Sequence, residues 1–157
     1  MTATAHALIG ASLAVKLTNP LVGIPIAFLS HFAADLVPHW DPGTNHKKKT
    51  KLRLKLEATA DVLIGFLLTY LIFARFVDPV YLFVMIIAAQ LPDWLEAPYF
   101  MFGIKLPPFT WFRWIGSTLQ TRMQLPWGLV TQVVIVGLLI YFSIGGSNLS
   151  SALASTF

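Results

Sequence analysis

The sequence predicts an all-helical protein that crosses a membrane several times, and its composition decides this class. Hydrophobic residues make up 56% of the 157 residues and charged residues only 11%, whereas an ordinary soluble domain has about 25% charged residues. Because a membrane-spanning helix takes about 20 residues, the chain has room for one membrane domain and little else. It contains no cysteine, which excludes disulfides, thiolate metal ligands and cysteine nucleophiles.

Five apolar stretches predict about five transmembrane helices. They cover residues 4–17, 21–38, 57–77, 79–97 and 126–145. Asn19-Pro20 and Asp78-Pro79 predict tight turns inside the first and second pairs, because proline cannot donate a helical amide hydrogen bond. The first four stretches are therefore expected to form two helical hairpins. The first stretch carries His6, has no basic residues before it and lacks a small-residue cleavage site, which indicates a retained helix rather than a signal peptide.

The two predicted hairpins resemble each other in sequence. Residues 5–10 read Ala-His-Ala-Leu-Ile-Gly and residues 60–65 read Ala-Asp-Val-Leu-Ile-Gly. With one deletion, the alignment pairs polar residues with polar residues: His6 with Asp61, Asp35 with Gln90, and His39 with Asp93. The chain therefore looks like a tandem repeat whose halves are related by an axis near the membrane normal. Chance similarity between two hydrophobic hairpins is the alternative.

The whole chain is expected to form a single membrane domain. Its predicted parts are repeat A (1–42), a basic loop (43–56), repeat B (57–98), an interfacial or re-entrant aromatic segment (99–125), a last helix (126–145) and a tail (146–157). A cytoplasmic basic loop leaves only Lys16 and Arg75 on the opposite side. This predicts an inner-membrane protein with a cytoplasmic N-terminus and an external C-terminus. Residues 46–55 are expected to contact anionic lipid headgroups and not nucleic acid.

Ionisable residues in and beside the apolar stretches are the strongest functional signal. Such a group costs roughly 2.5–3.5 kcal/mol at the centre of a membrane helix, so it persists when paired, bound to a metal or needed for chemistry. His31 and Asp35 are four residues apart and share one helical face. Pro38 disfavours helix at the preceding residue, so His39 and Asp41 can fold back toward that face or serve a second ion.

These residues predict a divalent metal site made of nitrogen and oxygen ligands. The expected ligands are His6, His31, Asp35, Asp61, His39 and Asp93. His39, Asp41 and Asp93 are also the candidate catalytic residues, as further ligands or as the base that activates water. Zinc is the preferred ion, with manganese or magnesium as alternatives. The other interpretations are a polar pair that joins helices at His31 and Asp35, a structural partner of histidine at Asp61, and a helix cap at Asp93.

Arginines in the aromatic segment are the candidate substrate-binding residues. Arg113 and Arg122 belong to a stretch rich in tryptophan and phenylalanine, which favours a location at the membrane surface. Their guanidinium groups could bind the phosphate of a lipid that enters beside the polar cluster. A plain membrane anchor is the alternative for this segment.

Three motifs resemble those of the YdjM-like inner-membrane proteins, which are classed as membrane-bound metal-dependent hydrolases. They are Ala-His-Ala-Leu-Ile-Gly at residues 5–10, Asp-Leu-Val-Pro-His-Trp-Asp at residues 35–41 and Leu-Pro-Asp at residues 91–93. The family pattern tends to have Pro-Asp-x-Asp-His, whereas this chain has Pro-His-Trp-Asp at residues 38–41. The resemblance covers roughly residues 1–98 and implies a metal-dependent hydrolase.

Together these features predict a hydrolase that acts at the cytoplasmic interface on a lipid-linked ester, with a phosphoester preferred. A bound ion would lower the pKa of a water ligand toward about 7 and stabilise charge on the ester oxygen. The competing interpretations are a transporter of metal ions or protons and a non-catalytic protein with a structural metal. Hydrolysis is favoured because the polar groups lie at one depth, whereas a transport pathway needs them through the full depth of the membrane.

Overall fold

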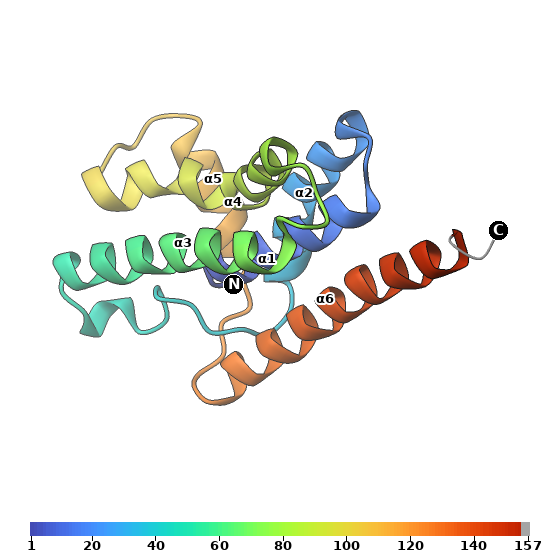
Figure 1. Cartoon of the computed structure of the whole chain (residues 1–157). Coiled ribbons are helices and arrows are strands. Elements are labelled where there is room, and N and C mark those ends of the chain that lie inside the picture. The colour runs from blue at the N-terminus through green and yellow to red at the C-terminus, as the bar shows by residue number, and fades with distance from the viewer. Residues whose placement is uncertain (155–157) are drawn as a thin grey trace.

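The computed structural model describes the backbone of residues 1–154 and the side chains up to residue 145. Within that range the regular elements are all helical (Figure 1), which confirms the predicted all-α class. They are α1 (Ala3–Lys16), α2 (Pro20–Asp35), a single 3-10 turn η1 (His46–Lys48), α3 (Lys51–Phe73), α4 (Pro79–Phe102), α5 (Phe109–Leu119) and α6 (Trp127–Ala154). The predicted tail overlaps the end of α6, and its last residues, 155–157, lie outside the described part.

Turn residues set the helix boundaries where the sequence predicts them. Asn19 caps α2 by accepting a hydrogen bond from Leu21 N, and proline occupies the first turn of the helix. Asp78 caps α4 in the same way, with its carboxylate accepting from Val80 N and Tyr81 N. Helix α4 ends at Phe102, and the next residue, Gly103, has a φ of 71°, in the left-handed region that favours glycine.

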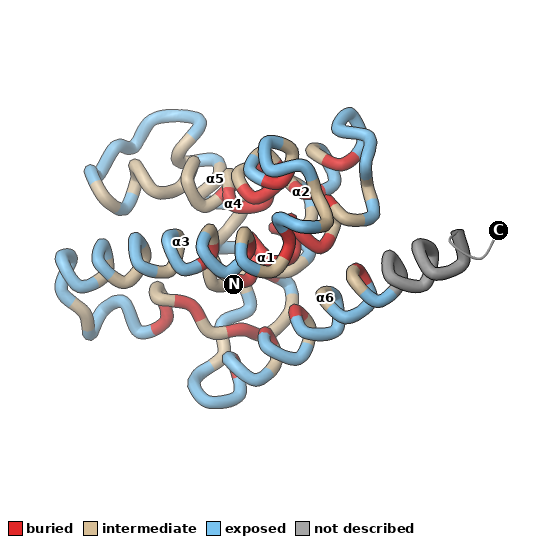
Figure 2. The backbone as a smooth tube through the Cα atoms, viewed as in Figure 1, coloured by how far each residue is buried: buried red, intermediate tan, exposed pale blue. Residues whose placement is uncertain are grey.

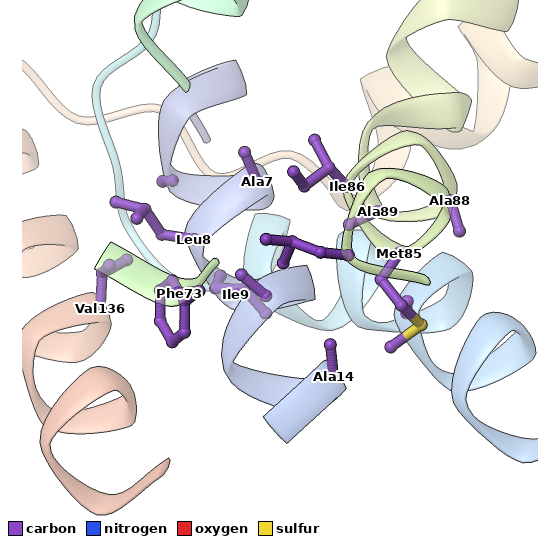
Figure 3. Close-up of a cluster of buried hydrophobic side chains, with 14 of the residues drawn as sticks. Ala7, Leu8, Ile9, Ala14, Phe73, Met85, Ile86, Ala88, Ala89 and Val136 are labelled. Carbon is purple, nitrogen blue, oxygen red and sulfur yellow. The ribbon is translucent and has the colours of Figure 1, made fainter. Parts of the chain in front are cut away.

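Helix α1 lies inside the molecule, surrounded by other helices. Ten of its 14 residues are buried, and it packs against α3, α4 and α6 (Figure 2). The buried core draws Ile9 from α1, Phe73 from α3, Ile86 from α4 and Val136 from α6 (Figure 3). An α1 of this length measures about 21 Å at 1.5 Å per residue, which is shorter than the roughly 30 Å hydrocarbon core of a bilayer.

Glycine allows α1 to approach its neighbours closely. A Cβ atom at Gly10 would lie 2.7 Å from the carbonyl oxygen of Met85 and 2.8 Å from Cβ of Ala89 on α4. At Gly65 of α3 a Cβ atom would lie 3.0 Å from Cα of Thr4 on α1. Small residues at helix crossings are typical of membrane-helix packing. These two glycines occupy equivalent positions of the predicted repeat.

Three helices are long and apolar enough to cross a membrane: Lys51–Phe73, Pro79–Phe102 and Trp127–Gly145. Helix α2 is apolar but shorter, at 16 residues. Many large apolar side chains of these helices are exposed in the isolated chain, as expected for surfaces that face lipid. A membrane protein is therefore supported, while five spans and the repeat remain predictions.

Several predicted boundaries differ from the structure. Helices α2 and α3 end at Asp35 and Phe73, before the predicted residues 38 and 77, and α6 continues beyond residue 145. Helix α3 begins at Lys51 instead of residue 57, because the Thr50 side chain caps it at Arg53 N and the lysines and arginine that follow are good helix formers. Helix α4 continues beyond residue 97 to Phe102. The segment predicted to be interfacial contains α5, which packs against α4 and α2.

Candidate metal centre

The carboxylate of Asp35, at the end of α2, is the centre of a buried polar cluster. Asp35 Oδ1 lies 3.3 Å from His6 Nε2 and 3.7 Å from His39 Nε2. The other oxygen, Oδ2, lies 3.5 Å from His31 Nε2. The amino group of Met1 also pairs with Oδ1. Three histidines, from α1, α2 and the segment after α2, thus surround one carboxylate. The sequence predicted this proximity for His31, and the break expected at Pro38 allowed it for His39.

Backbone carbonyl groups fix the orientation of two of these imidazole rings. His31 Nδ1 lies 2.9 Å from the carbonyl oxygen of Ala89 on α4. His39 Nδ1 lies 2.7 Å from the carbonyl oxygen of Val37. A carbonyl oxygen only accepts, so in both rings Nδ1 carries the hydrogen and Nε2 of the neutral ring presents a lone pair. Metal-binding histidines are typically oriented by such contacts at the second ring nitrogen.

The lone pairs of His31 and His39 therefore face carboxylate oxygens, which are themselves only acceptors when ionised. His39 Nε2 and both ring nitrogens of His6 are buried without a hydrogen-bond partner. The His6 ring stacks on the His31 ring with centroids 3.9 Å apart. Buried polar atoms without partners are costly. A cation between the imidazole nitrogens and the carboxylates would make this arrangement favourable, and the Met1 amino group supplies one positive charge at Asp35 Oδ1.

The spacing of the donor atoms fits a small divalent cation. Zinc binds nitrogen and oxygen ligands at about 2.0–2.2 Å, so two ligands of a tetrahedral site are roughly 3.3–3.6 Å apart. Asp35 Oδ1 lies 3.3 Å from His6 Nε2, and Asp35 Oδ2 lies 3.5 Å from His31 Nε2. Asp93 of α4 adds a further oxygen at 3.6 Å from His31 Nε2. One donor atom each from His6, His31 and Asp93 lie within 4.8 Å of one another.

Asp41 is held beside this cluster by several hydrogen bonds. Its Oδ2 accepts from Arg122 Nε at 3.0 Å and from Gln120 Nε2 at 3.0 Å, and Oδ1 accepts from Thr44. His39 Nε2 lies 3.7 Å from Oδ2. Burial by itself would raise the pKa of Asp41, but the neighbouring His39 and Arg122 outweigh it and hold the pKa well below its usual range. Asp41 is therefore an ionised group that can stabilise a protonated His39.

Asp61 belongs to α3, and its carboxylate accepts hydrogen bonds from backbone and side-chain donors at the start of α1. Oδ2 accepts from Ala3 N at 2.7 Å, and Oδ1 accepts from Thr4 N at 3.1 Å and from Thr4 Oγ1 at 2.7 Å. Free helix amide groups and the helix dipole both favour a negative charge at this place. The structure thus gives Asp61 a helix-capping role, and its role as a metal ligand remains a prediction.

A short extended segment, residues 120–123, supports the loop that follows α2 and carries His39. His39 N donates to the carbonyl of Thr121 at 3.0 Å, and Met123 N donates back to the carbonyl of His39 at 2.6 Å. Thr121 N donates to the carbonyl of Asp35 at 3.0 Å. The predicted interfacial segment therefore ends in a strand-like pairing that fixes the backbone of both Asp35 and His39.

Helix α6 completes this support with two residues that the sequence analysis missed. A Cβ atom at Gly128 would lie 2.7 Å from Trp40 N and 3.0 Å from the carbonyl carbon of His39, so the loop passes directly over this glycine. Gln132 donates to the carbonyl of Trp40 at 2.7 Å and accepts from Thr2 N at 3.0 Å. A buried glutamine in an apolar stretch is the signal that could have indicated such a role.

Four of the predicted site residues line a cavity of about 370 Å³ between α3, α4 and the loop: Asp41, Asp61, Asp93 and Arg122. Asp93 has the most exposed side chain of the cluster, at 37%. Apolar residues form the opposite wall, among them Val62, Leu63 and Trp94. Arg122 lines this cavity, whereas Arg113 forms an ion pair at 3.2 Å with Glu96, which also lines it. The polar cluster is thus open on one side to a space with apolar walls.

Comparisons with known proteins leave the chain without an assigned family. No family model matches the sequence, and neither a curated protein nor a solved structure matches it.

Proposed function

We propose that this protein is a membrane-embedded, divalent-metal-dependent hydrolase and that the Asp35 cluster is its metal centre. The observation that carries the proposal is the set of histidine Nε2 atoms of His6, His31 and His39 that lie 3.3–3.7 Å from Asp35. A metal cation between these nitrogen atoms and the carboxylate would stabilise the buried site. The YdjM-like motifs support the same class of function.

The proposed roles follow from the position of each side chain. His6, His31, Asp35 and Asp93 would hold the ion, with zinc preferred and manganese or magnesium as alternatives. When bound, the ion would supply a water ligand with a pKa near 7 and a positive charge to polarise the ester. His39 would take a proton at Nε2, because its Nδ1 hydrogen is fixed on Val37.

The cavity beside the cluster supports a lipid-linked ester as the substrate. Its wall combines the apolar side chains of α3 and α4 with Asp41, Asp93 and Arg122 at one end. An amphiphile fits a cavity with both polar and apolar lining, because its ester would contact the polar residues and its chain would contact the apolar ones. Arg122 is suited to bind a phosphate of that ester, while it also positions Asp41. The charge asymmetry of the loops favours a position of this end at the cytoplasmic face of an inner membrane.

Turnover of a lipid-linked phosphoester tests this proposal. Purified protein in liposomes is expected to release the product of a substrate panel, to lose turnover after chelation and to recover it when zinc or manganese is returned. Asp93→Asn should lower kcat because the amide is a poor metal ligand and a weaker base. Metal flux across sealed vesicles without hydrolysis of any ester in the panel would instead support a transporter.

A further inference from the structure

A second cavity, of about 230 Å³, lies next to the first and has a basic lining. Its charged or ionisable lining residues are His46, Lys51, Lys55, Arg113 and Arg122, and its lining contains no carboxylate residue. The metal-side cavity, in contrast, is lined by Asp41, Asp61, Asp93 and Glu96. The two spaces therefore differ in charge although they lie between the same two helices, α3 and α4.

The two cavities adjoin each other. They share seven lining residues, which are Pro42, Gly43, Ala58, Ala97, Phe100, Met101 and Arg122. Apolar residues of α3 and α4 thus border both spaces, and Arg122 stands between the acidic end and the basic end. A single elongated ligand can extend from the polar cluster into the basic cavity along this common wall.

The positive charge of the basic cavity is only partly neutralised within the protein. Arg122 pairs with Asp41 and Arg113 pairs with Glu96. Within the described part of the chain, Lys51 and Lys55 have no ion-pair partner. Two lysines of one helix, one turn apart, thus leave a net positive charge at the mouth of the cavity, where like charges repel unless an anion lies between them.

Aromatic faces hold two of these cations in place without neutralising them. The Arg113 guanidinium lies 4.5 Å from the centre of the Phe100 ring. The Lys55 ammonium lies 5.5 Å from the centre of the Phe102 ring. Cation–π contacts orient a cation but leave its charge available to an anion. The cavity therefore has oriented donors and an apolar floor, a combination that suits a phosphate attached to a hydrocarbon chain.

We propose that the basic cavity binds a phosphate group of an anionic amphiphile, through Lys51, Lys55 and Arg113, at a place separate from the metal centre. Binding of the amphiphile does not depend on the proposed function. Only the identification of this amphiphile with the hydrolase substrate rests on that function. It narrows the substrate class to amphiphiles that carry a phosphate beyond the ester held at the metal centre. The phosphate could belong to a lipid headgroup or be free in solution, and the apolar lining favours the lipid.

Binding of short-chain phosphatidic acid to metal-free protein tests the cavity independently of catalysis. Dioctanoyl phosphatidic acid, dioctanoylglycerol and inorganic phosphate are titrated by calorimetry into chelator-treated protein in an uncharged detergent. Phosphatidic acid should bind most tightly. Dioctanoylglycerol lacks the phosphate and inorganic phosphate lacks the chains, so each should bind at least about tenfold more weakly.

A matched pair of double variants separates this cavity from general surface charge. Lys51→Gln with Lys55→Gln should weaken phosphatidic acid binding about tenfold or more. Lys47→Gln with Lys48→Gln removes the same charge from exposed residues outside the cavity lining and should change it less than about twofold. Equal weakening in both variants, or binding of inorganic phosphate or dioctanoylglycerol as tight as that of phosphatidic acid, would overturn the proposal. Binding without turnover would contradict the hydrolase and leave the phosphate site standing.

Discussion

The two helical hairpins, α1 with α2 and α3 with α4, use equivalent polar positions in different ways. In the first hairpin, His6 and Asp35 face each other at 3.3 Å in the centre of the polar cluster. In the second, Asp61 caps α1 and Gln90 donates to the carbonyl of Ala3 at 3.0 Å. The first hairpin thus supplies most of the candidate ligands, while the second fixes the position of the helix that carries one of them.

What the hairpins share is close helix packing. Gly10 and Gly65 both lie where a Cβ atom would meet a neighbouring helix at 3.0 Å or less. The two glycines therefore have the same packing role in both hairpins, whereas the equivalent polar residues have different roles. This difference predicts that substitution of His6 or Asp35 impairs metal binding, whereas substitution of the equivalent Asp61 or Gln90 impairs stability.

Replacing Asp35 by asparagine should have the largest effect. The amide keeps the size of the side chain but is a poor metal ligand, and Asp35 is the group that contacts all three histidines. Zinc affinity, measured by competition with a chromogenic chelator, is expected to fall about 100-fold or more. The helical circular dichroism should stay unchanged. Unchanged zinc affinity would remove Asp35 from the site.

Replacing Gly10 by alanine should cause the next largest effect, and it should act on stability. The new Cβ atom would meet the Met85 carbonyl at 2.7 Å and Ala89 at 2.8 Å, so α1 and α4 must move apart. A loss of about 1–3 kcal/mol is expected from such overpacking. Thermal unfolding in detergent measures it. Gly137→Ala on α6 is the control, because nothing lies within 4 Å of that position, and it should be neutral or stabilising.

Replacing Asp61 by asparagine should separate the two hairpins most clearly. The variant loses the charge that caps α1, so the unfolding free energy should fall by about 1 kcal/mol. Zinc affinity should change less than about threefold, because the change reaches the site only through the position of α1. A loss of zinc as large as that of Asp35→Asn would instead make Asp61 a ligand, as the repeat predicts.

Replacing Arg122 by glutamine should have the smallest effect at neutral pH. Arg122 helps to hold the pKa of Asp41 below its usual range. A lowered pKa in the folded state stabilises the protein above the unfolded-state pKa of about 3.9, and this contribution is lost as the pH falls. The variant should therefore lose stability at a higher pH than the wild type during acid titration, followed by tryptophan fluorescence. Coincident acid transitions would argue against the Arg122–Asp41 pair.

The sequence predicted the helical class and the residues of the polar cluster because both depend on local composition and spacing. Asn19 and Asp78 marked helix starts that the structure places at the next residue. The burial of α1 could not be predicted, since an apolar helix facing protein resembles one facing lipid. The pairing of residues 120–123 with His39 was also missed, because it joins backbone groups far apart in the chain. The ligand roles of individual residues remain predictions.

X-ray absorption spectroscopy of zinc-loaded protein tests the central claim most directly, because it reports the atoms that surround the ion. We predict a shell of nitrogen and oxygen at about 2.0–2.1 Å with the outer scattering of histidine rings. That histidine scattering should weaken in His31→Ala. A shell of oxygen alone, or a protein that takes up no zinc under metal-replete conditions, would contradict a metal centre around Asp35.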